Sequence, residues 1–249
     1  MASQTLRVAK ISWYVLGPAP IHGGEFLNPF TKMLAMGLFL SAFTGMSMTP
    51  NWAAANPFGP DYVEITANDV IALDIRYATT HNFTGRNVYG THNTCFLHQQ
   101  AAAKLFRAAE LLRTYSPGYK LLVFDCLRPR SVQRLFWGVV KGTPQQPYVA
   151  NPDKGSLHNF GFAVDLSLLG PDGHELDMGT PFDAFTEAAQ PKLETKLLAK
   201  GVLTQPQLER RMILRRVMTE AGFLQLPNEW WHYDALDGKT VRKNYRIVE

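Results

Sequence analysis

The stretch SLHNFGFAVD (residues 156–165), read together with EWWH (residues 229–232), decides how this chain folds. The two segments supply two imidazoles, His158 and His232, and one carboxylate, Asp165. Two histidines and a carboxylate are a usual ligand set for a hydrolytic zinc that keeps one coordination position open for water. Glu229 lies three residues before the second histidine and is free to act as a base. We therefore expect the two segments to meet, although they lie far apart in the sequence.

The joint pattern resembles a known superfamily. Ser-x-His-x-x-Gly-x-Ala-x-Asp followed by Glu-x-x-His is similar to the zinc D-Ala-D-Ala metallopeptidases. In the form Glu-Trp-Trp-His, the second segment resembles the D-alanyl-D-alanine dipeptidases of the VanX type. The resemblance implies one Zn²⁺ per chain on His158, Asp165 and His232, with Glu229 as the general base. It also implies a small dipeptide, D-Ala-D-Ala, as the substrate.

Further segments carry the same resemblance from about Tyr62 to Tyr245. The segment DCLRP (125–129) matches a motif whose arginine faces the zinc-bound oxyanion, and this implies that role for Arg128. A guanidinium suits the task because it is a rigid, permanently charged fork. The family also implies that Tyr77 and Ser156 contact the substrate and that Asp183 binds its free ammonium.

Each of these residues also has a plainer interpretation. A single histidine is more often an ordinary hydrogen-bonded side chain than a ligand, and Arg128 could form a surface salt bridge. Tyr77 could be a half-buried aromatic at a strand end, and Asp183 could cap a following helix.

Two other functions would use part of the same set. A peptidoglycan D,D- or L,D-carboxypeptidase would keep the zinc ligands but cut longer stems, and the match at Asp183 speaks against it. A non-catalytic, zinc-stabilised binding domain would need neither Glu229 nor Arg128.

Composition sets broad limits. The chain has 249 residues, of which 46% are hydrophobic and 18% charged, as in a globular protein of one domain or a small pair. A net charge of +4 without a basic cluster argues against nucleic acid as a partner. The oligomeric state is left open.

The N-terminal part of the chain differs from the rest. Lys32 precedes an uncharged, mostly apolar run over residues 33–48, which is short for a membrane span, and Ala53-Ala54-Ala55 follows. We expect a leader over residues 1–55 with a secretory signal cleaved after Ala55, and a dipeptidase domain over residues 56–249. The enzyme would then be periplasmic or secreted, with no stable membrane insertion after cleavage. A buried core helix and an uncleaved anchor are the alternatives.

The two cysteines, Cys95 and Cys126, both lie in the expected mature part. An oxidising compartment would let them pair. From the sequence they could equally be two small buried apolar residues.

Patterning predicts one α+β domain, with helices packed on a mainly antiparallel sheet. The expected strands are 62–65, 70–77, 119–124, 160–168 and a last edge strand over 242–248. The expected helices are 97–114, 131–140 with Leu135, Phe136, Val139 and Val140 on its buried side, and one that begins after Thr204 and stops at Gly222. Glu229 is expected on a turn just before a strand that begins at Trp230.

Overall fold

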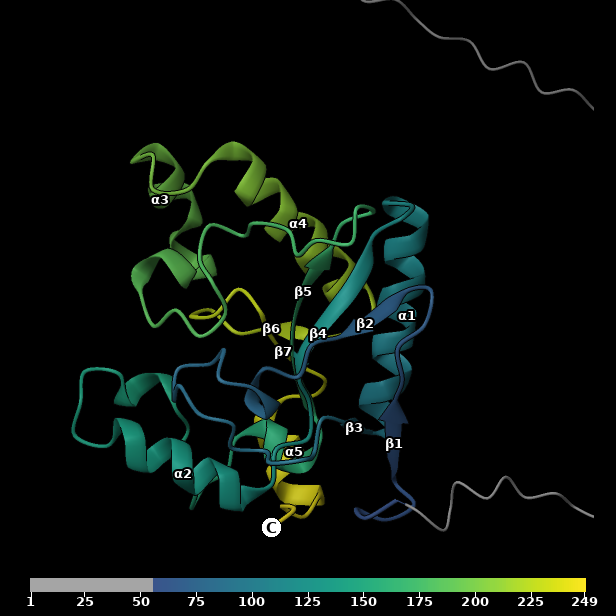
Figure 1. The fold of residues 1–249 in the computed structure, drawn as a ribbon, viewed down its shortest axis with the longest axis vertical. Coiled ribbons are helices and arrows are strands. Elements are labelled where there is room, and N and C mark those ends of the chain that lie inside the picture. Colours follow the sequence, from purple (N-terminus) through teal and green to yellow (C-terminus); the bar gives the residue numbers. More distant parts are fainter. Residues whose placement is uncertain (1–55) are drawn as a thin grey trace, which may run out of the picture. The chain divides into compact units, whose positions relative to one another are not determined.

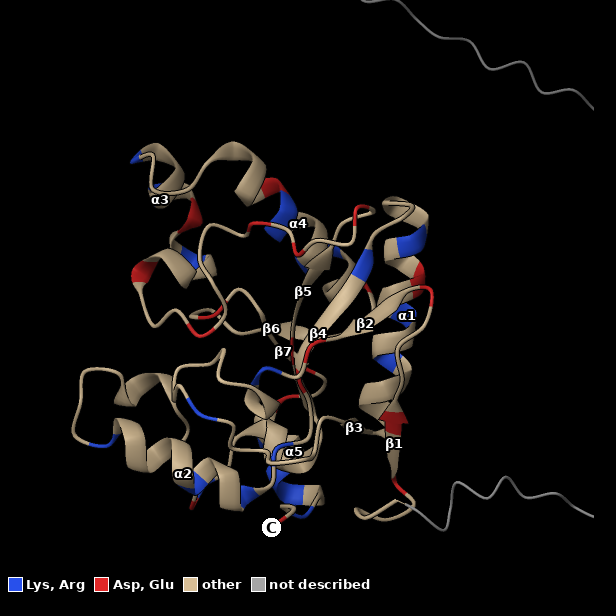
Figure 2. Ribbon diagram, viewed as in Figure 1, with Lys and Arg blue, Asp and Glu red and all other residues tan. Residues whose placement is uncertain are grey.

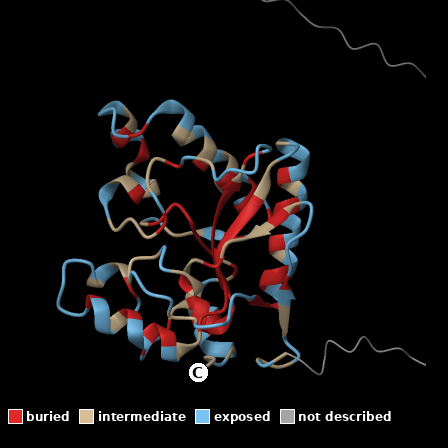
Figure 3. Ribbon diagram, in the orientation of Figure 1, coloured by how far each residue is buried: buried red, intermediate tan, exposed pale blue. Residues whose placement is uncertain are grey.

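Two central strands carry most of the sheet in this computed structural model, which describes residues 56–249. They are β4 (Lys120–Asp125) and β5 (Ala163–Leu169), which pair antiparallel. Figure 3 shows both as buried over most of their length, as expected for near-continuous apolar runs at the centre of a sheet. Three shorter strands complete it: β2 (Ile71–Leu73), β6 (Leu224–Gln225) and β7 (His232–Asp234).

The sheet has the strand order β2-β4-β5-β7-β6, and only the β2–β4 pair is parallel. The expected α+β domain with a mainly antiparallel sheet is confirmed. The strand expected over 70–77 ends at Leu73, because the chain then turns into a 3₁₀ helix, Arg76–Ala78, that carries Tyr77.

A second, two-stranded sheet pairs β1 (Tyr62–Ile65) with β3 (Cys95–His98). The strand β3 was not expected, since its last residues were assigned to the following helix. That helix, α1 (Gln99–Tyr115), begins only after His98, whose ring Nδ1 accepts a hydrogen bond from the backbone N–H of Gln100 (3.3 Å). A side-chain acceptor of this kind satisfies one of the free N–H groups that open every helix.

Helices α1 and α4 (Gln205–Glu220) pack against each other and against the central sheet (Figure 1). Both helices carry basic residues together with Glu (Figure 2), and the basic residues are in excess: α1 has three Lys or Arg and one Glu, and α4 has four Arg and two Glu. The other α-helices are α2 (Arg130–Val140), α3 (Glu194–Ala199) and α5 (Gly238–Asn244). The remaining 3₁₀ helices are Gln146–Tyr148, Leu157–Phe160, Glu187–Ala189 and Pro191–Leu193.

The prediction for the buried face of one helix needs correction. In α2, Phe136 and Val140 are buried as expected, but Leu135 and Val139 are 54% and 51% exposed. The buried face instead runs through Val132 and Gln133, because Gln133 reaches inward to the guanidinium of Arg128.

The edge strand expected over 242–248 is wrong. The sequence Asp237-Gly238 is typical of a hairpin turn. In the structure, the Asp237 carboxylate instead accepts hydrogen bonds from the N–H groups of Lys239 and Thr240 and caps the start of the helix α5.

The leader lies outside the described residues, so the expected signal segment and cleavage after Ala55 stay predictions. Within residues 56–249 no helix is both long and apolar enough to cross a bilayer. Cys95 and Cys126 form a disulfide that joins β3 to the segment after β4.

Candidate active site

Three candidate metal ligands meet at one end of the central sheet. His158 comes from the 3₁₀ helix Leu157–Phe160, and Asp165 and His232 face each other across the β5–β7 pair. His232 Nδ1 lies 2.9 Å from Asp165 Oδ1, while His158 Nε2 lies 3.2 Å from His232 Nδ1 and 3.3 Å from Asp165 Oδ1. All three side chains are buried. The fold therefore brings together the three groups that the sequence pattern singled out.

The outward nitrogen of each imidazole is held by an acceptor. His158 Nδ1–H donates to the backbone carbonyl of Cys126 (2.7 Å), and His232 Nε2–H donates to Asp234 Oδ1 (2.9 Å). A neutral imidazole has a single N–H, so the inward nitrogen of each ring presents a lone pair to the cluster. Histidines that bind metals almost always make such a second hydrogen bond, because it fixes the tautomer and the ring orientation.

This arrangement fits a cation. Two ring lone pairs and a carboxylate oxygen converge without a hydrogen between them, which is stable only with positive charge at the centre. Burial lowers the pKa of His232, but the carboxylates of Asp234 and Asp165 together raise that pKa well above its usual value. The cluster therefore attracts a proton or a metal ion, and its two nitrogens and one oxygen are a donor set found in catalytic zinc sites.

Arg128 is held at the edge of this cluster. Its Nε and Nη2 donate to Asp125 Oδ2 (3.0 and 2.5 Å), and its Nη1 donates to Gln133 Oε1 (2.9 Å). Its Nη2 also lies 3.7 Å from Asp165 Oδ2. Of five guanidinium N–H groups, these bonds within the described part of the chain leave one on each terminal nitrogen. Since Arg128 is only 7% exposed, the interpretation as a surface salt bridge is wrong.

Asp183 has a left-handed backbone, with φ of 61°, which residues other than glycine seldom adopt. Its Oδ1 accepts a hydrogen bond from Tyr77 Oη (3.0 Å) and its Oδ2 accepts one from the N–H of Phe83 (3.1 Å). Desolvation by the surrounding protein raises the pKa of Asp183 to about 7. Asp183 is not a helix cap, because the next 3₁₀ helix, Glu187–Ala189, begins after Thr186.

Glu229 follows the turn at residues 227–228, as expected, although β7 begins at His232 rather than at Trp230. Its Oε2 lies 4.0 Å from His232 Nδ1. Within residues 56–249 no group donates a hydrogen bond to this carboxylate, so both oxygens can accept a proton. Burial raises the pKa of Glu229 to about 8, and the charge of His232 opposes this shift.

Ser156 and its neighbours shape the backbone around His158. Ser156 Oγ accepts from the N–H of His158 (3.4 Å), and Asn159 Oδ1 accepts from the N–H of Ser156 (2.8 Å), which together cap the 3₁₀ helix. Gly161 has φ of 71°, and a Cβ there would lie 2.7 Å from the ring of Tyr62. Part of the motif thus fixes the position of His158.

All eight residues that the sequence singled out line one cavity of about 290 Å³. They are Tyr77, Arg128, Ser156, His158, Asp165, Asp183, Glu229 and His232. Phe83, Phe136, Tyr148, Phe185 and Trp231 add an aromatic lining.

The sequence interpretation missed three supporting groups. Asp234 was expected on the same side of its strand as His232, and that shared face was the signal for its contact. Asp125 stood in the matched motif, but its hydrogen bonds to Arg128 were not foreseen. The carbonyl of Cys126 is a backbone group and leaves no mark in the sequence.

Comparisons with known proteins agree with this site. A model of the peptidase M15 family, described as D-Ala-D-Ala dipeptidase, matches residues 60–248. A D-alanyl-D-alanine dipeptidase of Escherichia coli K12 is 30% identical over 167 residues, which cover 66% of this chain and 78% of that protein. Proteins of the same name from Enterococcus faecalis and Enterococcus faecium are 31% and 32% identical, over 67% and 66% of this chain and 87% and 85% of theirs. With its fold and its family match, this chain belongs to the D-Ala-D-Ala dipeptidase family and is a metallopeptidase.

Proposed function

We propose that this protein hydrolyses the free dipeptide D-alanyl-D-alanine to two D-alanines with one zinc ion. The observation that carries the proposal is the shared cavity. It is lined by a metal-ligand cluster, by a carboxylate (Glu229) that accepts no hydrogen bond within residues 56–249, by an arginine with N–H groups left free within the same residues, and by a second carboxylate (Asp183). Its volume of about 290 Å³ lies just below the usual range for ligand pockets, roughly 300–1,000 Å³. The site is therefore suited to a small substrate.

His158, Asp165 and His232 would hold the zinc. A zinc ion bound there would lower the pKa of a water to roughly 7 and polarise the scissile carbonyl. Glu229 takes a proton from the attacking water and returns it to the leaving amine, which requires a carboxylate that no other group occupies. Arg128 offers its two remaining N–H groups to the oxyanion that develops.

Asp183 determines the length of the substrate in this proposal. Its carboxylate pairs with the free ammonium of the dipeptide, while Tyr77 and the N–H of Phe83 hold it in place. Tyr77 and Ser156, which both line the cavity, contact the substrate. A longer peptide, or one with a blocked amine, leaves this carboxylate without its cation. Loss of one partner of a buried charged pair costs on the order of 3–5 kcal/mol.

A comparison of two substrates tests the proposal. We expect kcat/KM for D-Ala-D-Ala to exceed that for N-acetyl-D-Ala-D-Ala by about 10²–10³-fold or more, since each 1.4 kcal/mol is about tenfold. Asp183→Ala should weaken cleavage of the free dipeptide more than any residual cleavage of the blocked one. Equal kcat/KM for the two substrates in the wild type would reject the ammonium site and favour a carboxypeptidase. Activity that survives complete removal of metal by a chelator would reject the zinc mechanism.

We also propose that the enzyme acts outside the cytoplasm. The disulfide between Cys95 and Cys126 supports this, because disulfides persist mainly in oxidising compartments. The apolar run over residues 33–48 with Ala53-Ala54-Ala55 after it is a second, independent argument.

A further inference from the structure

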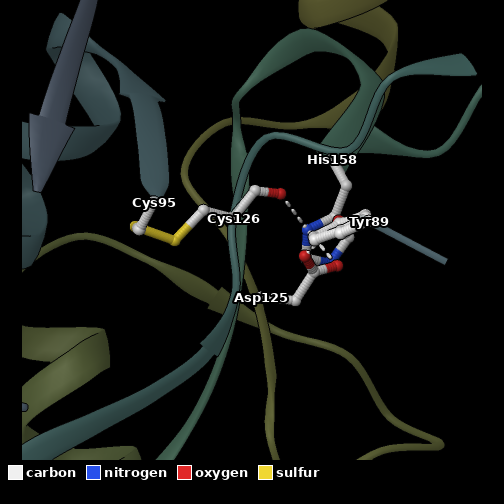
Figure 4. The surroundings of a disulfide bond; sticks show 5 residues. All are labelled: Tyr89, Cys95, Asp125, Cys126 and His158. Atoms are coloured by element: carbon white, nitrogen blue, oxygen red, sulfur yellow. Dashed lines mark hydrogen bonds and ion pairs between the residues drawn. A yellow bond between two sulfur atoms is a disulfide. The ribbon is translucent and has the colours of Figure 1, made fainter. Parts of the chain in front are cut away.

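At one end of the disulfide, two neighbouring residues contact side chains of the candidate metal site. Cys126 forms the disulfide through its side chain and accepts the hydrogen bond of His158 Nδ1 through its carbonyl (2.7 Å). In Figure 4 the side chain of Cys126 leads to Cys95, and its carbonyl leads in another direction to the His158 ring. The preceding residue, Asp125, lies 3.6 Å from the same Nδ1 and holds Arg128.

The partner strand β3 is tied to both segments that carry the site. Leu127 N–H donates to the carbonyl of Phe96 (2.9 Å), next to Cys95. His98 N–H donates to the carbonyl of Gly161 (2.9 Å), which directly follows the helix of His158. Arg128 N–H donates to the carbonyl of His158 (3.1 Å). Three chain segments are thus joined around His158, and the disulfide is the one covalent link among them.

We propose that the Cys95–Cys126 disulfide is a positioning element for the metal site. By fixing the segment after β4, it holds the Cys126 carbonyl where it orients the His158 ring. The protein with the disulfide then binds zinc more tightly than the dithiol form. This inference rests on the proposed zinc ligand set, and it adds a dependence of metal affinity on the redox state of the chain.

The size of the effect follows from the bond that the disulfide supports. Loss of an outer hydrogen bond to a metal-binding histidine typically lowers metal affinity by about 10–100-fold. The backbone carbonyl of Cys126 cannot be removed by substitution. Its hydrogen bond to His158 can instead be weakened by removal of the disulfide.

The first experiment measures zinc affinity in the full-length protein by competition with a chromophoric chelator. The double variant Cys95→Ala, Cys126→Ala has no thiols that could bind zinc themselves. We expect it to bind zinc about 10–100-fold more weakly than the wild type. The control is Leu112→Ala, at a buried α1 residue that does not line the cavity, because the void it leaves also destabilises the fold. It should retain the wild-type zinc affinity at a comparable loss of thermal stability.

The outcomes separate a positioning role from a stabilising one. Equal zinc affinity of the double variant and the wild type would overturn the inference, even if the variant melts at a lower temperature. So would an equal loss of affinity in Leu112→Ala. If the wild type binds no zinc, the proposed function fails as well. If it binds zinc but does not cleave D-Ala-D-Ala, only the proposed function fails.

The second experiment uses the wild-type chain and does not depend on a variant that folds. Zinc binding and disulfide reduction are two coupled equilibria, and such coupling is reciprocal. If the disulfide strengthens zinc binding by some factor, zinc must favour the disulfide over the dithiol by the same factor. The fraction of disulfide is measured by alkylation in glutathione buffers, with free zinc either buffered at saturation or absent. We expect a shift of about 10–100-fold in the reduction equilibrium, and tenfold corresponds to about 30 mV. No shift, or a shift toward the dithiol, would contradict the inference.

Discussion

At the scale of single residues, Glu229 differs from its neighbours because nothing in the described part of the chain donates a hydrogen bond to it. We expect Glu229→Gln to bind zinc with nearly unchanged affinity and to lose hydrolysis, because the amide keeps the shape but has no basic lone pair at neutral pH. Zinc content by atomic absorption and turnover of D-Ala-D-Ala check this. Stoichiometric zinc with near wild-type turnover would exclude Glu229 as the base.

Arg128 offers a second test at this scale. Its fork is held by Asp125 through two nitrogens and by Gln133 through the third. Arg128→Lys places a single point charge on a flexible stem and cannot reproduce this geometry. We expect turnover to fall at least about tenfold. As a control, Arg113→Lys alters an exposed ion pair on α1 and should leave the rate unchanged; an unchanged rate for Arg128→Lys itself would remove Arg128 from the mechanism.

Asp183 predicts a pH dependence of stability in the metal-free protein. Its pKa is raised from 3.8 to about 7, chiefly by burial. Between these values the unfolded chain has released its proton while the folded chain retains it. The unfolded state therefore binds fewer protons, and the free energy of unfolding falls as the pH rises through this window.

Asp183→Asn should flatten this fall, because the amide does not titrate. Urea unfolding from about pH 4 to pH 8 measures the slope in both proteins. A residual slope is expected from Glu229, whose pKa is raised to about 8. Identical slopes in the wild type and the variant would mean that Asp183 titrates normally.

At the scale of helices and strands, sequence patterns located the elements with strong local signals. The helix α4 begins after Thr204, as predicted, and the structure shows that Thr204 and Gln207 form a capping box there. The strand β4 was found as an uninterrupted apolar run. The patterns failed where a polar residue has two local uses: Asp237 can open a turn or a helix, and only the packing of α5 decides between them.

The sequence predicted more of the candidate site than of the fold around it. Its side chains stand in motifs whose spacing is visible in the sequence. Some of the groups that hold these side chains leave no such mark, since the Cys126 carbonyl reaches His158 through the tertiary fold alone. The strand β3 was missed for the same reason, as its partner strand is the distant β1.

Thr204 gives the prediction for this scale. Its Oγ1 accepts a hydrogen bond from the N–H of Gln207 (3.4 Å), and Gln207 Oε1 accepts one from the N–H of Thr204 (2.9 Å). Thr204→Ala should lower the free energy of unfolding by about 1 kcal/mol without a change in kcat/KM. Thr204→Ser keeps the oxygen and should be close to the wild type. A loss of activity in Thr204→Ala would show that α4 acts on the site.

At the scale of the whole molecule, the leader expected over residues 1–55 leads to a prediction of where the enzyme is found. We expect protein isolated from its native host to begin near Asn56 and to lie outside the cytoplasm. Intact mass spectrometry of the purified protein and fractionation of the host measure both. A soluble cytosolic protein that retains residues 33–55 would refute the signal.

If the proposed ligands hold a metal, the pairing of Asp165 with His232 across β5 and β7 would make metal binding depend on correct folding. Side chains alternate between the two faces of a strand, so a slip of one residue would turn His232 to the opposite face and leave the ligand set open. A metal ion that needs this ligand set would bind only chains with the native register and would enrich them by mass action. Refolding with zinc present should therefore give a higher yield of native protein than refolding in a chelator, because misregistered chains are not retained.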